Sequence, residues 1–514
     1  MVEGEGLPAV PRLLFWKTCS IPAIIGVIQG PPFVRSFFRR DFLKTIVWFR
    51  NDLRLHDHPA LKEASECGEV LPVFILPNHA SPTASDWWLF ESLKSLQQQL
   101  LKLGSTLTIL KGEPSRVLSV LSKKTQADAV FFNGQVDPVS RREEMALLES
   151  ESLSEVNVRR FAPNMLLDPT LLKTGAGDPY KVFGAFWKSL QQQTIPWPIA
   201  APASLASWID EYPGTIPLEQ SGLRDSIDWD TSFEKVWIPG EAASFEQWAN
   251  FRDKGLKGYD TKRDFPAING TSRLSGFLAS GNMSIRALWH AVKRAQEEGI
   301  APQPEPFLRQ LAWREFSYYQ LFHFPDITER PLRPEFLHFP WLEDPAGLTA
   351  WKKGKTGYPL VDAGMRELWE TGTIHNRVRM VVASFLVKHL LIDWRMGAVW
   401  FRETLVDYDV ANNTLGWQWI AGSGFDAAPY FRIFNPTTQS KKFDKNGAYI
   451  RKWVPELAAL PGASLHEPHM APEDVLTEAG VVLGETYPLP IVDHTAARAR
   501  ALDAYAHIKG KKEG

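Results

Sequence analysis

One stretch decides how the second half of the chain folds, and it contains the segments GTIHNRVRM (372–380), DWRMG (393–397), DYDVANNTLGWQW (407–419) and DAAPYFRIF (426–434). Asn376, Arg379 and Met380 are three and four residues apart, so they share one face of a helix. Asp407 and Asp409 flank a single residue. Polar and aromatic residues at these spacings, inside apolar sequence, predict a buried site for a flat, charged ligand.

The charges of this stretch have two interpretations. Buried charges need partners, so Arg379 and the two aspartates could form a structural salt bridge. Alternatively, the same side chains could meet the N–H groups and carbonyls of a heteroaromatic ring. His375 is either a packed or capping residue or a proton donor. Three tryptophans of this half are either core or an electron-hopping chain: Trp341, Trp394 and Trp417.

Around this stretch, from about Ser244 to Leu460, strand signals nearly vanish. Apolar residues recur at helical spacing in segments such as SIRALWHAVKRAQEEG (284–299), PFLRQLAWREFSYYQLF (306–322) and NRVRMVVASFLVKHLLIDW (376–394). This half is therefore predicted to be an all-helical domain. After Pro461 the sequence is loop-rich, with one last helix expected over 494–510.

The first half has a different pattern, in which short apolar runs alternate with helical segments. Strands are predicted at 45–49, 70–76, 106–110 and 127–132. This alternation predicts a parallel, Rossmann-like α/β sheet with helices on both faces. The first strand is followed by FRNDLRLHDHPAL rather than by GxGxxG, so its charges either cap the sheet edge or line a cleft.

These patterns give four segments: an N-terminal extension (1–44), an α/β domain (45–174), a Pro- and Gly-rich linker running over the surface (175–240) and a helical domain (241–514). The extension is apolar and basic. It has three interpretations: a transit peptide, the product of a mis-assigned start codon, or a folded arm. Its apolar run IPAIIGVI is too short to span a bilayer, and no other segment indicates a membrane.

Composition narrows the possible partners. The net charge is −2, so a polyanion such as DNA must meet a local basic patch. The two cysteines form neither a disulfide framework nor a metal site, and HExxH, CxxC and GKS/T motifs are missing from the sequence. A phosphate cradle is conceivable at TSRLS (271–275), whose hydroxyls and Arg precede a helix, although a plain helix start would have the same pattern.

Taken together, these segments resemble one family. The motifs WFRNDLRLHDHPAL (48–61), TSRLS, WREF (313–316), KTGYPLVDAGMREL (355–368) and HNRVRMVVASFLVKHLLIDWR (375–395) make the chain from about Thr45 similar to the DNA photolyase/cryptochrome family. The pattern is most similar to bacterial-type class I cyclobutane pyrimidine dimer photolyases. The resemblance implies an α/β antenna domain and a helical domain that holds U-shaped FAD. A second, antenna chromophore would be methenyltetrahydrofolate or deazaflavin.

The resemblance also implies roles for individual residues. Residues implied to bind FAD are Tyr259, Thr271, Ser272, Arg273, Leu274, Ser275, Asn376, Arg379, Asp407 and Asp409. Asn413 corresponds to the asparagine beside flavin N5, and Trp417, Trp394 and Trp341 correspond to the relay from flavin to surface. Residues implied to receive the flipped dimer are Gln310, Trp313, Arg377, Met380 and Trp419. Arginines implied to contact backbone phosphates are Arg263, Arg377 and Arg432.

The implied activity is light-driven repair, in which reduced FAD donates an electron to a pyrimidine dimer flipped out of damaged DNA. The protein would act as a monomer in the cytoplasm, or in an organelle or nucleus if residues 1–44 are a targeting segment. Two of the departures from the family pattern bear on repair: Gln310 replaces a glutamate, and Thr373 replaces a tryptophan. They favour the alternative, a cryptochrome-type photoreceptor with FAD and a Trp relay, whereas the lack of a long tail favours repair.

Overall fold

The structure is a computed structural model that describes residues 42–77, 81–224, 230–426 and 431–510. Residues 42–514 cluster as one compact unit. The expectations for the N-terminal extension therefore lie outside the described residues, except at its last three positions. Of these, Leu43 and Lys44 already belong to the first strand.

The first half is a parallel sheet of five strands in the order β3-β2-β1-β4-β5. The strands are β1 (Leu43–Phe49), β2 (Gly68–Leu76), β3 (Thr108–Lys111), β4 (Ala129–Asn133) and β5 (Asn157–Phe161). The four predicted strands are present. Sequence reasoning missed β5, because this edge strand reads NVRRF and is largely exposed, so it has no apolar run.

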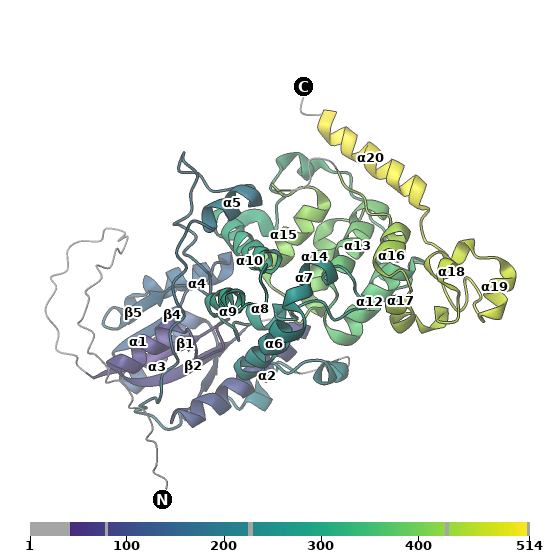
Figure 1. The fold of residues 1–514 in the computed structure, drawn as a ribbon. Coiled ribbons are helices and arrows are strands. Elements are labelled where there is room, and N and C mark those ends of the chain that lie inside the picture. Colours follow the sequence, from purple (N-terminus) through teal and green to yellow (C-terminus); the bar gives the residue numbers. More distant parts are fainter. Residues whose placement is uncertain (1–41, 78–80, 225–229, 427–430, 511–514) are drawn as a thin grey trace, which may run out of the picture. The chain divides into compact units, whose positions relative to one another are not determined.

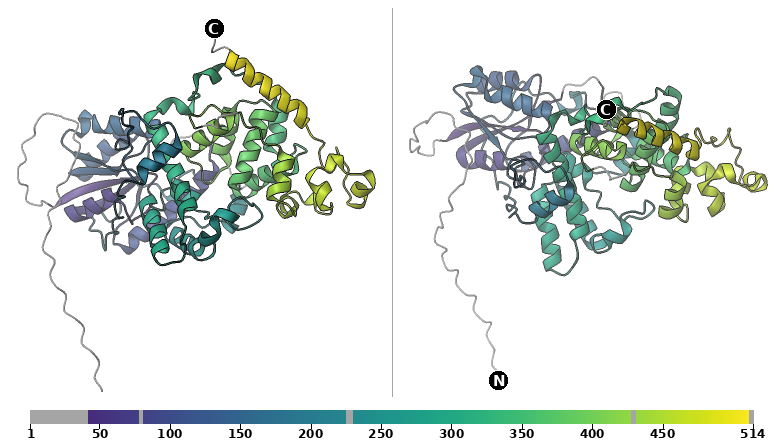
Figure 2. Two further views of the ribbon diagram at one scale, coloured as in Figure 1. Left: turned by 45° about the horizontal axis from the view of Figure 1, so that its top comes forward. Right: turned by 90° about the horizontal axis from the view of Figure 1, so that it is seen from above.

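Helices cover both faces of the sheet, as Figures 1 and 2 show. The helices are α1 (Pro59–Cys67), α2 (Ala84–Lys102), α3 (Pro114–Thr125) and α4 (Pro138–Leu148). Alternate residues of each strand point to opposite faces, which divides the apolar side chains between two cores. One core joins β1 to α1 and α2, and the other joins β1 to α3 and α4. The predicted α/β class is confirmed.

The second half is helical, as predicted, and contains α6 (Glu241–Lys254), α7 (Tyr259–Lys262), α8 (Ser275–Ala279), α9 (Ile285–Glu297), α10 (Glu305–His323), α11 (Pro345–Lys352), α12 (Pro359–Thr371), α13 (Asn376–Ser384), α14 (Trp394–Thr404), α15 (Val410–Ala421), α16 (Pro436–Phe443), α17 (Ala448–Trp453), α18 (Gly462–His466), α19 (Glu473–Glu478) and α20 (His494–Gly510). A π-helical segment, Phe385–His389, follows α13. No helix within the described ranges is both long and apolar enough to cross a membrane.

The linker is less superficial than predicted. Within it lies α5 (Phe183–Leu190), which buries Phe183, Phe186 and Trp187 in the core that also contains α10. The sequence FGAFWKSL has helical apolar spacing, and this local pattern outweighs the surrounding prolines and glycines.

The charges that follow β1 hold the two halves together. Asp57 binds the guanidinium of Arg286 at 2.6 and 3.1 Å, and Arg54 donates to the carbonyl of Gly281 at 3.1 Å. The carboxylate of Glu241 accepts the backbone N–H groups that follow Arg54, at 3.0 and 2.8 Å. Most of these groups are buried, so the charges neither line an open cleft nor merely cap the sheet.

Candidate functional site

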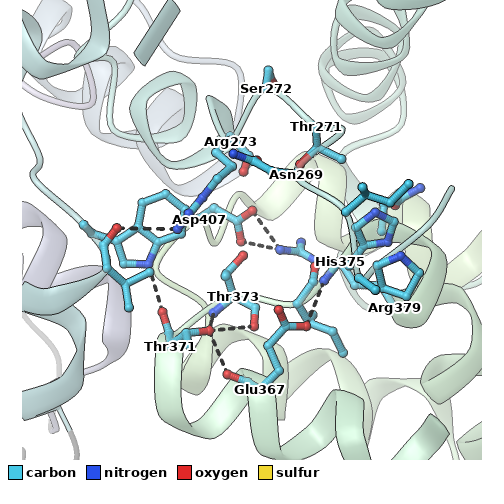
Figure 3. A pocket seen from close by; sticks show the side chains of 18 of the residues that line it. Asn269, Thr271, Ser272, Arg273, Glu367, Thr371, Thr373, His375, Arg379 and Asp407 are labelled. Carbon is cyan, nitrogen blue, oxygen red and sulfur yellow. Dashed lines mark hydrogen bonds and ion pairs between the residues drawn. The ribbon is translucent and has the colours of Figure 1, made fainter. Parts of the chain in front are cut away.

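A cavity of about 710 Å³ opens in the helical half (Figure 3). Its walls come from the loop before α8, the end of α12, the start of α13 and the loop before α15. Nine of the ten predicted FAD-binding residues line it: Tyr259, Thr271, Ser272, Arg273, Leu274, Ser275, Asn376, Arg379 and Asp407. Segments far apart in the sequence thus meet in one place.

The TSRLS segment forms one wall of the cavity. Arg273 has a φ of 54°, a left-handed conformation that turns the chain just before α8 begins. Gln247 holds the carbonyl of Ser272 at 2.7 Å, and the Arg273 guanidinium lies 4.3 Å above the Trp237 ring. The wall therefore presents hydroxyl groups and a cation from a fixed backbone.

An ion pair forms part of the cavity wall, where Figure 3 shows Arg379 and Asp407 facing each other. One guanidinium nitrogen of Arg379 lies 2.8 Å from each carboxylate oxygen of Asp407, and Nε of Arg379 donates to the carbonyl of Ile374 at 3.0 Å. The Asp407 side chain is 5% exposed and that of Arg379 is 26% exposed. The structural salt bridge inferred from the sequence is present, and it is also part of the cavity wall.

Glu367 and His375 also line the cavity. Burial raises the pKa of Glu367, although hydrogen bonds from Tyr449 and from the backbone of His375 act in the opposite direction. Burial lowers the pKa of His375 to about 4, so the imidazole is neutral at physiological pH. Its Nδ1 accepts the N–H of Arg377 at 3.2 Å, which confirms the capping interpretation. The sequence analysis did not single out Glu367, because the spacing of the residues around it does not indicate a catalytic or binding role.

Asp409 was predicted to bind FAD but does not line this cavity. Its carboxylate accepts the backbone N–H of Asn412 at 2.7 Å and so caps α15. An aspartate directly before the first residue of a helix is well suited to this N-cap role. The sequence spacing alone did not distinguish a ligand-binding aspartate from a capping one.

Asn413 and Trp394 line a second cavity of about 670 Å³, between α4 and the helices α14 and α15. The Asn413 side-chain nitrogen donates to the carbonyl of Ala398 at 3.1 Å. The ring of Trp417 is 2% exposed, as is that of Trp394, and its nearest aromatic contacts are Phe401 at 5.0 Å and Trp351 at 6.3 Å.

Trp341 is half-buried and packs against Phe339 with ring centroids 4.3 Å apart. The three tryptophans predicted to form a relay thus lie in the helical half, two of them in its main core. Their positions are those of core residues. The relay remains a prediction.

The predicted substrate residues lie outside the 710 Å³ cavity. Gln310 is half-buried and donates to the carbonyl of Pro306 at 3.4 Å, and Trp313 stacks on Phe183 with centroids 3.6 Å apart. Met380 and Trp419 pack at the edge of the main helical core.

Arg377 and Arg432 line a third cavity, of about 500 Å³, together with Lys442. Arg377 also pairs with Asp264 at 2.9 Å. Arg263 lies apart from this cavity, 5.5 Å from the Tyr259 ring.

Comparison with known proteins decides the family. Residues 45–203 match the model described as DNA photolyase, and residues 307–507 match the FAD binding domain of DNA photolyase. This chain belongs to the DNA photolyase family. A deoxyribodipyrimidine photo-lyase of Agrobacterium fabrum is 46% identical over 468 residues, which cover 90% of this chain and 98% of the relative. Cryptochrome-2 of Arabidopsis thaliana is 38% identical, covering 88% of this chain and 77% of the relative.

Solved photolyase and cryptochrome structures have the same fold. A bacterial class III photolyase from Agrobacterium tumefaciens has a TM-score of 0.88 at 46% identity, covering 93% of this chain and 99% of that one. A cryptochrome from Synechocystis has a TM-score of 0.83 at 30% identity, covering 90% and 99%. The predicted photolyase/cryptochrome membership and the predicted FAD cofactor are confirmed.

Proposed function

We propose that this photolyase is a light-driven DNA-repair enzyme, a deoxyribodipyrimidine photo-lyase that splits cyclobutane pyrimidine dimers. One observation carries the proposal. The 710 Å³ cavity gathers nine residues expected around FAD, in a chain that is 46% identical to a deoxyribodipyrimidine photo-lyase along 98% of that relative.

The chemistry of the cavity wall fits the cofactor. Hydroxyl groups and the Arg273 cation of the TSRLS wall suit the FAD phosphates, because hydroxyls and guanidinium groups donate to phosphate oxygens. The Arg379–Asp407 pair and Asn376 offer donors and acceptors to the edge of a flat ring. When bound and reduced, FAD supplies the electron that splits the dimer after light absorption.

The residues outside the cavity would receive DNA. Gln310, Trp313, Met380 and Trp419 are assigned to the pocket for the flipped dimer, where Gln310 offers an uncharged amide. The third cavity has three cationic side chains, Arg377, Arg432 and Lys442, against the single carboxylate of Asp264. Phosphate contacts there would raise the affinity for DNA without selecting a base sequence. This suits an enzyme that recognises damage rather than sequence. The enzyme would work as a monomer, in the cytoplasm if its source is bacterial.

The subclass follows the solved relative rather than the motif pattern. The sequence motifs predicted class I, whereas the Agrobacterium structure that is 46% identical is a class III photolyase. Gln310 and Thr373 depart from the class I pattern. We infer that this chain is a class III enzyme, an inference that its 46% identity to that structure supports.

The second candidate function is a cryptochrome-type photoreceptor. Two observations favour it: Gln310 lacks the charge of the usual glutamate, and a plant cryptochrome is 38% identical to this chain. An assay of the reduced holoprotein with dimer-containing single- and double-stranded DNA separates the two functions. Loss of dimers in the light supports repair, and light-driven flavin reduction without dimer loss supports the photoreceptor.

A further inference from the structure

The third cavity, of about 500 Å³, has aromatic walls that a site for phosphate alone does not need. Of the phenylalanines that line it, Phe434 and Phe443 are 9% and 7% exposed, whereas Phe265 is 36% exposed. The centroids of the Phe265 and Phe443 rings lie 6.1 Å apart at an interplanar angle of 66°, so the two rings meet edge-on rather than face to face. Phe265 therefore offers ring surface to a partner that enters the cavity.

Cationic side chains line the same space. The Arg377 guanidinium lies 4.4 Å from the centroid of the Phe443 ring, and one of its nitrogens pairs with Asp264 at 2.9 Å. Lys442 on α16 is exposed, and within the described ranges of the chain it forms no ion pair. The cavity thus combines cations with an accessible aromatic ring. Proteins hold single-stranded nucleic acid with this combination, in which the cations meet the phosphates and the rings stack on the bases.

The third cavity lies beside the FAD cavity, because the same two segments of the chain line both. At the start of α13, Asn376 lines the FAD cavity and Arg377 lines the third cavity. In the segment after α7, Pro266 lines the FAD cavity and Phe265 lines the third cavity. A DNA strand whose dimer reaches the FAD cavity therefore has its neighbouring nucleotides close to the third cavity.

We propose that the third cavity holds an unpaired base that flanks the dimer, stacked on Phe265, while Arg377 and Lys442 contact the adjoining phosphates. This inference rests on the proposed function, which makes damaged DNA the substrate, and it adds a base site to the phosphate contacts assigned there. A base inside a duplex is already stacked and paired, so the site takes single-stranded DNA or a duplex that has opened around the lesion. Every base has an aromatic face, so the site does not select a sequence.

The test is the binding of DNA to the full-length holoprotein in the dark, where no dimer is split. Fluorescence anisotropy follows a labelled single-stranded oligonucleotide that carries one thymine dimer. Phe265→Leu keeps an apolar side chain but removes the aromatic ring, so it should weaken binding by about fivefold or more, the lower end of the effect of losing one base–aromatic stack. A second oligonucleotide keeps the dimer and the sugar–phosphate backbone but lacks the base on each side of the dimer. On this DNA the same substitution should change the affinity little, because the partner of the ring is already missing.

Two further variants separate stacking from charge and from general effects of substitution. Lys442→Ala should weaken the binding of both oligonucleotides alike, and it should lower the slope of log affinity against log salt concentration by about 0.7, the value for one phosphate contact on a single strand. Phe245→Leu is the matched control, since Phe245 on α6 is 42% exposed but does not line the cavity. It should leave the affinity for both oligonucleotides and the FAD content unchanged.

The base site is overturned if wild type binds the two oligonucleotides equally well. It is also overturned if Phe265→Leu weakens the binding of both alike, because the ring would then be only a part of the wall. Repair is scored separately, by the loss of dimers in the light. Base-dependent binding through Phe265 in a protein that repairs no dimers would contradict the proposed function and support the base site. Repair without this dependence would overturn the base site alone.

Discussion

At the scale of single residues, the Arg379–Asp407 ion pair is a contact of the cavity wall that a substitution can test. Asp407→Asn leaves Arg379 without its counter-charge, so the free energy of unfolding should fall by about 2–3 kcal/mol, less than for a fully buried pair because Arg379 is 26% exposed. Urea unfolding of the FAD-free protein measures this loss, and FAD should be retained more weakly. Asp264→Asn removes the carboxylate that pairs with Arg377. Because Asp264 is more exposed than Asp407, the free energy of unfolding should fall by less than about 1 kcal/mol. Equal losses would contradict this ranking.

His375 gives a prediction about pH. Its pKa is about 4 in the folded protein and about 6.5 in the unfolded chain, so the unfolded chain binds more protons between these values. This contribution to stability is complete above pH 6.5 and is lost as the pH falls towards 4. His375→Asn keeps a capping side chain but removes the titration. The drop in unfolding free energy from pH 7.5 to pH 5 should be smaller in the variant than in wild type, and an unchanged drop would show that His375 charges without cost.

At the scale of elements, the contact between α14 and α15 depends on a glycine. A Cβ at Gly397 would lie 2.1 Å from the Trp417 ring, so Gly397→Ala must push the helices apart. Overpacking of this kind typically costs about 1–3 kcal/mol, and it should also slow flavin photoreduction if Trp417 is in the electron path. Gly416→Ala on α15 meets no atom within 4 Å and should instead stabilise the protein by about 0.5–1 kcal/mol. If Gly416→Ala also destabilised the protein, the expected gain from helix propensity would be wrong, whereas the prediction for the Trp417 contact would stand.

The elements also show what sequence could and could not predict. Period and apolar content predicted the sheet and the helical half, and the family resemblance predicted nine of the residues that meet in the cavity. They did not predict β5, whose residues are mostly polar, or α5, which is embedded in a loop-like composition. A capping carboxylate and a ligand-binding carboxylate look the same along the chain, so the sequence could not show that Asp409 caps α15.

At the scale of the whole molecule, the buried network around Asp57 joins the α/β half to the helical half. Asp57 is 1% exposed at its side chain and Arg286 is 13% exposed, so Asp57→Ala leaves a nearly buried cation. The free energy of unfolding should fall by about 3–5 kcal/mol. Calorimetry should also resolve two transitions where we expect one for wild type, because the halves lose the Asp57–Arg286 ion pair between them. A single transition at the wild-type temperature would show that this network does not hold the two halves together.

The central claim is that the cavity holds FAD in order to repair DNA. The most direct measurement uses the full-length holoprotein with FAD fully reduced, a DNA oligonucleotide carrying one thymine dimer, and blue or near-UV light, with chromatographic counting of intact dimers. The account predicts loss of the dimer in the light, no loss in the dark and faster loss in Gln310→Glu. Intact dimers after prolonged illumination, with FAD still bound and reduced, would contradict it.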